Sequence, residues 1–145
     1  MVKTALLVTL LIVSGCGTGK AHRMHQGEYL PRSKVAILRD TTNFFFVAYC
    51  ETRFWSMDGI NVRGKRTLEL LPGAHEVDFS MELVGYSSAS RSGSLKFQAE
   101  AGHEYQLKVT NCMSTPRFEP WIEDKTTGKV VAGTRPKKQE SEQNT

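Results

Sequence analysis

The sequence predicts an all-β protein, a single small β-sandwich of antiparallel strands. Apolar and polar residues alternate with a period of two over several short segments, which is typical of strands with one face on a core and one face in water. Turn-forming dipeptides separate these segments, and no stretch shows a long helical pattern with end caps. A chain of 145 residues has room for one core of ordinary size.

The strands follow from the alternation, and the turns from the Asp-Gly and Pro-Gly pairs between them. Strands are expected at Val35–Leu38, Phe44–Tyr49, Leu68–Leu70, Val77–Leu83, Leu95–Ala101, Tyr105–Val109, Trp121–Ile122 and Val130–Val131. Phe44–Tyr49 is apolar on both faces, which predicts a central strand. The last two segments flank the turn Asp124–Gly128 and are expected to pair as a hairpin.

The N-terminus has the layout of a secretory signal peptide. Lys3 precedes the apolar run Ala5–Val13, and small residues follow it up to Cys16. The run is too short to span a bilayer, which takes about 20 apolar residues. An ordinary signal peptide cut nearby would leave Cys16 as an odd thiol.

The four residues Val13-Ser14-Gly15-Cys16 resemble the lipobox of bacterial lipoproteins. This resemblance implies that residues 1–15 are removed and that the Cys16 thiol carries a diacylglycerol. Several acyl chains anchor firmly, because each buried methylene adds roughly 0.8 kcal/mol. Gly17 stands where Asp would resemble a signal for inner-membrane retention. The bilayer is therefore the first expected partner, with the outer membrane facing the periplasm favoured in a Gram-negative host.

Composition divides the chain into four parts. Residues 1–15 are the expected signal peptide, and residues 16–33 are glycine-containing without a hydrophobic period, which predicts a lipidated flexible tether. Residues 34–133 hold the predicted sandwich, and the polar residues 134–145 predict a disordered tail.

Two cysteines remain once Cys16 is assigned to lipid. Export places Cys50 and Cys112 in an oxidising space, where a disulfide is the expected state. The alternative is two separate buried thiols. Alternation through Val109 puts Cys112 on the face away from the core, so the bridge requires a bulge or a strand end there.

A second resemblance covers Phe54–Val109. It is carried by Met57-Asp58-Gly59, Leu70-Leu71-Pro72-Gly73-Ala74-His75-Glu76-Val77, Gly85-Tyr86 and Ala101-Gly102-His103-Glu104-Tyr105, which together resemble the PEGA domain. The resemblance implies a small β-sandwich module on a bacterial envelope protein. Such modules are regarded as structural or binding units rather than enzymes.

Histidines and serines offer only weak candidates for chemistry. His75 and His103 each open a strand and could meet near Asp58 as a metal site, or they could be turn histidines bonded to backbone. The group His22, Met24 and His25 could hold copper, or it could be part of a polar linker. Neither spacing is a ligand motif, so we expect no metal and no cofactor.

The serine-rich segment Ser87–Ser94 is expected to be a mobile hairpin loop. It lacks the Gly-x-Ser-x-Gly elbow of a nucleophilic serine, so we expect no enzyme activity. The alternative function is that of a periplasmic inhibitor or protective factor, in which the Ser87–Ser94 loop would insert into the active site of a lytic enzyme.

Aromatic and basic residues crowd one stretch of the chain. Arg53, Trp55, Arg63 and Arg66 are the candidate binding residues, because aromatics beside arginines favour interfaces. They could meet an envelope protein, stack on sugars or contact an anionic polymer, with peptidoglycan as one possible partner. The alternative places Trp55 in the core and the cations on a solvated edge.

Net charge does not indicate a nucleic-acid partner. The formal charge is +4, and much of the excess sits near the two ends of the chain. We therefore expect an envelope-anchored, non-enzymatic binding or structural accessory module.

Overall fold

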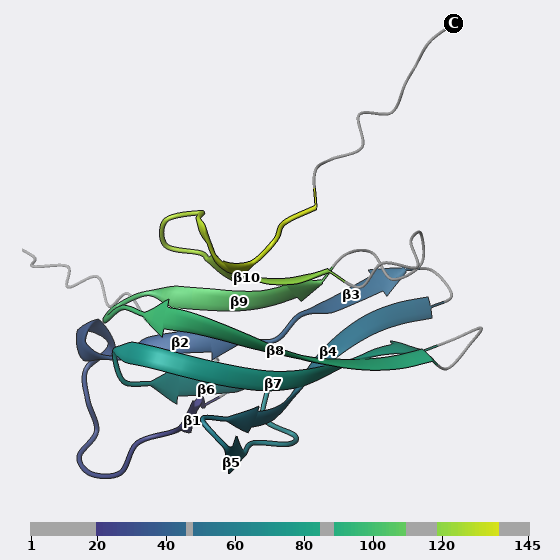
Figure 1. The fold of residues 1–145 in the computed structure, drawn as a ribbon. Helices are drawn as coiled ribbons and strands as arrows, with labels where there is room; N and C mark the ends of the chain where they lie inside the picture. The colour runs from purple at the N-terminus through teal and green to yellow at the C-terminus, as the bar shows by residue number, and fades with distance from the viewer. Residues whose placement is uncertain (1–19, 46–47, 85–88, 110–118, 137–145) are drawn as a thin grey trace, which may run out of the picture.

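The computed structural model describes residues 20–45, 48–84, 89–109 and 119–136, and within them the chain forms two packed β-sheets (Figure 1). The strands are β1 (His22–Arg23), β2 (Ala36–Arg39), β3 (Thr42–Phe45), β4 (Ala48–Met57), β5 (Ile60–Asn61), β6 (Thr67–Leu70), β7 (Gly73–Val84), β8 (Ala89–Ala99), β9 (Glu104–Val109), β10 (Pro120–Asp124) and β11 (Val130–Gly133). One 3-10 turn, η1 (Arg32–Lys34), precedes β2. These segments contain no α-helix, and the all-β prediction is confirmed.

The two sheets differ in how their strands pair. The first sheet has the order β1-β6-β2-β9-β10-β11, and the second has the order β3-β4-β7-β8 with β5 paired to β4. Most neighbours are antiparallel, but β1 pairs with β6 and β2 pairs with β9 in parallel. The predicted sandwich of antiparallel strands is thus found, and the two parallel pairs of the first sheet are a feature that the sequence pattern did not indicate. Between β2 and β9 the chain forms the whole second sheet as well as β6 of the first, which is a connection long enough for the parallel pair of β2 and β9.

The core lies between the sheets and is made by the inward positions of the alternating segments. Phe54 and Phe79 from the second sheet meet Leu38, Tyr105 and Leu107 from the first, and each is at most 1% exposed. Burial of each such side chain contributes about 1.5–3 kcal/mol. The strands predicted from a period of two thus supply the core.

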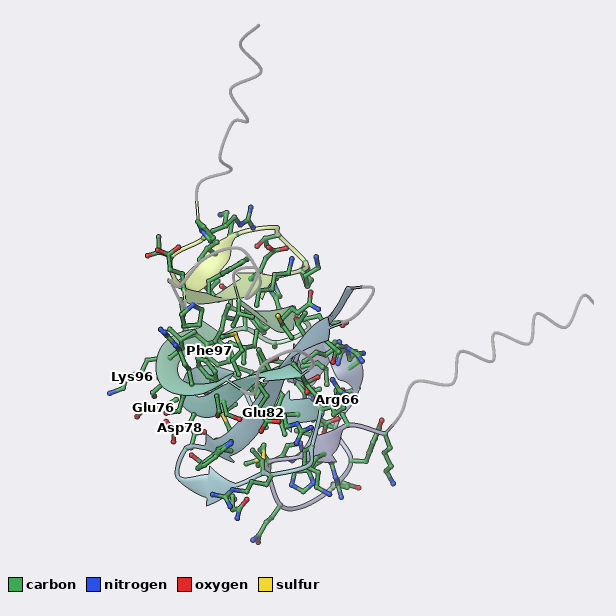
Figure 2. All side chains as sticks on the ribbon, turned by 90° about the vertical axis from the view of Figure 1, so that its right-hand side faces the viewer. Arg66, Glu76, Asp78, Glu82, Lys96 and Phe97 are labelled. Carbon is green, nitrogen blue, oxygen red and sulfur yellow. The ribbon has the colours of Figure 1, made fainter. Side chains whose placement is uncertain are left out.

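Phe97 of β8 shows how the aromatic residues pack (Figure 2). Its ring centroid lies 5.3 Å from that of Tyr105 and 6.1 Å from that of His75. The Tyr105 hydroxyl accepts a hydrogen bond from the Glu100 N–H at 2.9 Å, which satisfies its polar end inside the core.

The prediction of one central strand over Phe44–Tyr49 is wrong. Phe44 and Phe45 belong to β3, Tyr49 belongs to β4, and the two strands pair as an antiparallel hairpin with Phe45 opposite Ala48. Residues 46–47 lie outside the described residues. A continuous apolar run has no period that marks a reversal, so the sequence pattern alone does not reveal the turn.

The prediction of a loop over Ser87–Ser94 is also wrong for the part that the structure describes. Residues 89–94 are part of β8, with Ala89 opposite Leu83 and Ser94 opposite Asp78. Residues 85–88 lie outside the described residues. Serine has a low strand propensity, but pairing with the long β7 decides the conformation here.

Part of the expected flexible tether, residues 22–25, is docked onto the first sheet. β1 runs parallel to β6, and the Met24 N–H donates to the Glu69 carbonyl at 2.9 Å. The His25 ring nitrogen Nε2 lies 2.9 Å from Glu69 Oε1, and both side chains are under 10% exposed. At the other end, Arg135 pairs with Glu123 at 2.6 Å, so the first residues of the expected tail are also held.

No helix in the described part of the chain is long and apolar enough to cross a membrane.

Two glycines with positive φ, Gly133 at the end of β11 and Gly59 in the turn after β4, have very different surroundings, which predicts that they differ in how well they tolerate alanine. Gly133 has a φ of +71°, and a Cβ there would lie 2.2 Å from the Pro120 carbonyl oxygen; Gly59 has a φ of +78° and open space around it. We expect Gly133→Ala to lower the free energy of unfolding by about 2 kcal/mol, and Gly59→Ala by about 1 kcal/mol from backbone strain alone. Urea unfolding of both variants checks this, and equal costs would contradict it.

Candidate functional site

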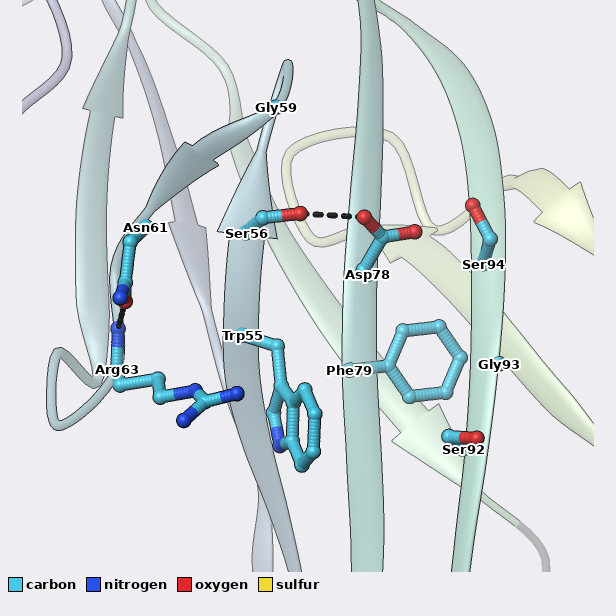
Figure 3. Close-up of a pocket in the computed structure, with 10 residues that line it drawn as sticks. All are labelled: Trp55, Ser56, Gly59, Asn61, Arg63, Asp78, Phe79, Ser92, Gly93 and Ser94. Atoms are coloured by element: carbon cyan, nitrogen blue, oxygen red, sulfur yellow. Dashed lines mark hydrogen bonds between the residues drawn. The ribbon is translucent and has the colours of Figure 1, made fainter.

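The outer face of the second sheet carries rows of small and charged side chains across three strands. Arg53 of β4 lies opposite Ser80 of β7, which lies opposite Ser92 of β8. The next row is Ser56, Asp78 and Ser94. The Ser56 hydroxyl donates to Asp78 Oδ2 (Figure 3). Register alone therefore places hydroxyls and one carboxylate side by side.

Trp55 stands out from this face because of an irregularity in β4. The pairing of β4 with β7 shifts register between Phe54 and Ser56, so Phe54 stays in the core while Trp55 points outward. Trp55 is 46% exposed, and its Nε1–H donates to Ser80 Oγ at 2.9 Å. The alternative in which Trp55 packs in the core is wrong.

Arg63 comes from the segment between β5 and β6 and lies against the indole (Figure 3). Its guanidinium carbon is 4.2 Å from the ring centroid, a distance at which cation–π attraction contributes about 0.5–1 kcal/mol at an exposed site. Its backbone N–H donates to Asn61 Oδ1 at 3.0 Å, and the Val62 N–H donates to the Trp55 carbonyl at 2.9 Å. These bonds hold the loop and the indole together.

A hollow of about 470 Å³ lies on one side of Trp55, and we call it the Trp55 trough (Figure 3). It is lined by Trp55, Ser56, Gly59, Asn61, Arg63, Asp78, Phe79, Ser92, Gly93 and Ser94. An aromatic wall with a few polar groups is the usual composition of a small-molecule site.

A second hollow of about 370 Å³ shares Trp55 and Arg63 with the trough and also contains Arg53 and Arg66. The structure therefore brings all four predicted binding residues together. The sequence prediction did not anticipate that acidic residues accompany them: Asp40, Glu51 and Glu82 line the same hollow.

Ion pairs neutralise much of the charge in this second hollow. Arg53 lies 2.9 Å from Glu51 and 3.6 Å from Glu82, and Arg66 lies 3.2 Å from both Asp40 and Glu51. Such pairs leave little net positive field to attract a polyanion. The arrangement thus disfavours an anionic polymer as the ligand.

Burial perturbs one carboxylate of this hollow. Asp40 is 7% exposed, and desolvation raises its pKa from 3.8 to about 6, although the charge and hydrogen bonds of Arg66 act in the opposite direction. The folded state therefore binds more protons than the unfolded state between these two values. The free energy of unfolding therefore falls as the pH rises from about 4 to about 6, and this loss of stability persists at higher pH.

The Asp40→Asn variant is expected to remove that cost. Relative to the wild type, it should gain stability between pH 4 and pH 7 by at most about 3 kcal/mol, the equivalent of the full shift. Urea unfolding at a series of pH values measures the difference, with the exposed Glu100→Gln as the control. Parallel curves for wild type and Asp40→Asn would contradict the assignment.

The two strand-opening histidines do not form a shared site. His75 Nδ1 lies 2.6 Å from Asp58 and its Nε2 lies 2.8 Å from the Leu71 carbonyl, while His103 Nδ1 lies 2.8 Å from Asp124. Each ring is thus bonded to the carboxylate of a different turn, and of the metal-site hypothesis the described residues keep the pairing of His75 with Asp58.

Metal and nucleophile candidates are not assembled elsewhere in the described segments. No group of three His, Cys, Asp or Glu side chains that could hold a metal occurs there. His22, Met24 and His25 are spread along the docked segment, with Met24 packed against the core and His25 bonded to Glu69. The serines of β8 share their face with Asp78 and Glu76 rather than with a histidine.

Of the three cysteines predicted to be modified, the structure describes one. Cys16 and Cys112 lie outside the described residues, while Cys50 is 1% exposed in β4. The lipid attachment and the pairing of Cys50 with Cys112 therefore stay predictions.

No family model matches this chain, and no curated protein and no solved structure matches it.

Proposed function

We propose that this protein is a lipid-anchored module of the bacterial cell envelope that binds an envelope protein or polymer and performs no catalysis. The observation that carries the proposal is the Trp55–Arg63 pair, raised on the open face of the second sheet between two hollows. A half-exposed tryptophan beside arginines is the composition of an interaction hot spot. The bonds that fix the indole reduce the ordering cost of binding.

The proposed anchor is Cys16, with the outer membrane facing the periplasm as its place in a Gram-negative host. Support comes from the lipobox-like sequence. The first described pairing with the sheet is at His22, so five residues lie between it and Cys16, and these six residue steps span at most about 21 Å. The module would therefore act close to the bilayer.

The relation to PEGA modules is part of the same proposal. Its support is local: Asp58 and Gly59 have φ values of 52° and 78°, which is the left-handed turn that this dipeptide favours between β4 and β5. The sandwich also includes β1, β2, β3, β10 and β11, which lie outside the resembling segment.

We propose in addition that Cys50 and Cys112 form a disulfide. Support comes from Cys50, which is 1% exposed in β4, and from Cys112 being the remaining cysteine once Cys16 carries lipid. Thiol labelling of the denatured, unreduced protein tests the bridge, since only reduction should release two reactive thiols.

The inhibitor alternative loses its support, because residues 89–94 of the segment proposed for insertion are paired in β8. The binding proposal is tested by crosslinking the lipidated protein in intact envelopes and identifying what it captures. We expect one dominant partner that is captured by the wild type, is lost with Trp55→Ala, and is reduced with Cys16→Ser. Unchanged capture by Trp55→Ala would reject this face.

A further inference from the structure

We propose that the Trp55 trough binds a neutral saccharide chain, with one sugar ring stacked on the indole. The inference rests on the proposed function and names the ligand of its binding face. It depends on the shape of the trough, on the state of the indole and on the polar groups around it.

The shape is that of an open channel with one high wall. On the floor, Ser92 and Ser94 present only hydroxymethyl groups and Gly93 presents no side chain, while Ser80 lies beneath the indole. Trp55 rises beside them because of the bulge in β4. A floor of small residues beside a tall aromatic leaves room for an extended chain of rings (Figure 3).

The indole is already fixed before any ligand arrives. Its Nε1–H is held by Ser80 and Arg63 lies over the ring, so Trp55 offers a ring surface rather than a hydrogen-bond donor. A pyranose has a face of polarised C–H groups, which the negative face of an aromatic ring attracts. Binding then needs little further ordering of this side chain.

The polar groups of the trough suit hydroxyls that both donate and accept. Asp78 has one oxygen engaged by Ser56 and keeps acceptor capacity. Asn61 uses its oxygen for the Arg63 N–H, which leaves its amide N–H₂ as a donor. With Arg63 and Asp78 as one charge of each sign, the trough favours a neutral polyol over a polyanion.

The competing occupant is an extended peptide. It would add to the edge of β8, whose pairing among the described strands is with β7 alone, and would form main-chain hydrogen bonds there. Such a peptide would not need the ring of Trp55 or the carboxylate of Asp78. Replacing Trp55 or Asp78 should therefore weaken the binding of a saccharide and leave the binding of a peptide unchanged.

The test uses Trp55 as its own reporter in a Trp121→Phe background. The chain has two tryptophans, and Trp121 is 9% exposed with an Nε1–H that has no partner among the described residues. Its replacement by Phe should leave the thermal midpoint within about 5 °C of the wild type. The probes are N-acetylchitotetraose, cellotetraose and maltotetraose, which share neutral pyranose chemistry and distinguish acetylated glycans from plain glucans.

We expect a saturable change in Trp55 emission with at least one probe, and at least fivefold weaker binding in Asp78→Asn. Glu100→Gln, on the turn after β8, is the matched control and should bind as the parent does. Calorimetry of Trp55→Ala should show at least tenfold weaker binding. Dextran sulfate should not compete.

The absence of any change up to about 10 mM of all three probes would overturn the saccharide proposal, as would binding that ignores Asp78→Asn. Capture of a protein partner that depends on Trp55, without saccharide binding, would reject this inference and leave the proposed function standing. Loss of both would reject the binding face itself.

Discussion

Asp124→Ala is expected to lower the free energy of unfolding by about 3 kcal/mol. Asp124 is 3% exposed at the end of β10 and organises the turn into β11. Its carboxylate accepts the Thr126 N–H at 2.8 Å, the Thr127 hydroxyl at 2.8 Å and a bond from His103 Nδ1 at 2.8 Å. Alanine would leave these part-buried donors without the acceptor they share, and the loss of one such acceptor from a buried position costs about 1–3 kcal/mol.

Asp58 provides the matched control, because it also joins a turn to a histidine. Its Oδ2 lies 2.6 Å from His75 and its Oδ1 accepts the Glu76 N–H, but its side chain is 40% exposed. Water can replace the lost bonds there, so Asp58→Ala should cost about 1 kcal/mol. Urea unfolding of both variants measures the difference, and an Asp124→Ala cost no larger than that of Asp58→Ala would contradict the account.

The same carboxylate gives the stability a defined pH dependence. Burial alone would raise the pKa of Asp124, but the hydrogen bonds from His103, Thr127 and Thr126 outweigh it and hold the pKa below 3.8. The folded state then releases this proton more readily than the unfolded state. The contribution is present above the unfolded value near 3.8 and is lost as the pH falls through the folded pKa, so Asp124→Ala should lose less stability on acidification than the wild type.

Cys112→Ser is expected to have the largest effect, about 4 kcal/mol, if Cys112 is bridged to Cys50 as proposed. A bond between Cys50 and Cys112 would close a loop over residues 50–112, which contains the strands β5 to β9. In the chain-entropy model, a loop of this length restricts the unfolded state by about that amount. Cys50 is 1% exposed, so the bridge would reach into the interior of the sandwich.

The control for the bridge is Cys50→Ser compared with the double variant. If the two cysteines form one bond, either single change and the double change should cost nearly the same, because the bond is already lost after the first. Additive costs would instead indicate two separate buried thiols. Unfolding of the three variants in urea without reductant decides between these outcomes.

Strand content was predictable from the sequence, whereas strand pairing was not. The alternation of Val77 and Phe79 on β7, and of Tyr105 and Leu107 on β9, correctly identified inward positions because a period of two maps onto the two faces of a sheet. The parallel pairing of β1 with β6 has no such signal, since the segment from residue 20 is polar and its contacts are non-local. Main-chain bonds and the Glu69–His25 contact hold it there.

The candidate site likewise contains residues that the sequence indicated and residues that it did not. Trp55 and the arginines were found because their residue types are typical of interfaces. Asp78 and Ser92 were missed, because their place beside Trp55 depends on the register of β7 against β4 and β8. The bulge at Trp55 was hidden as well, since a one-residue register shift leaves no mark in composition.

The central claim, that the face around Trp55 contacts an envelope ligand, is tested most directly by site-specific photo-crosslinking in intact envelopes. The photoreactive residue replaces Lys65, which lines the hollow next to Trp55, or Lys125, which lies in the turn after β10. We expect one dominant adduct from position 65 that disappears with Trp55→Ala, and none from position 125. Equal adducts from both positions, or an adduct from position 65 that persists in Trp55→Ala, would contradict it.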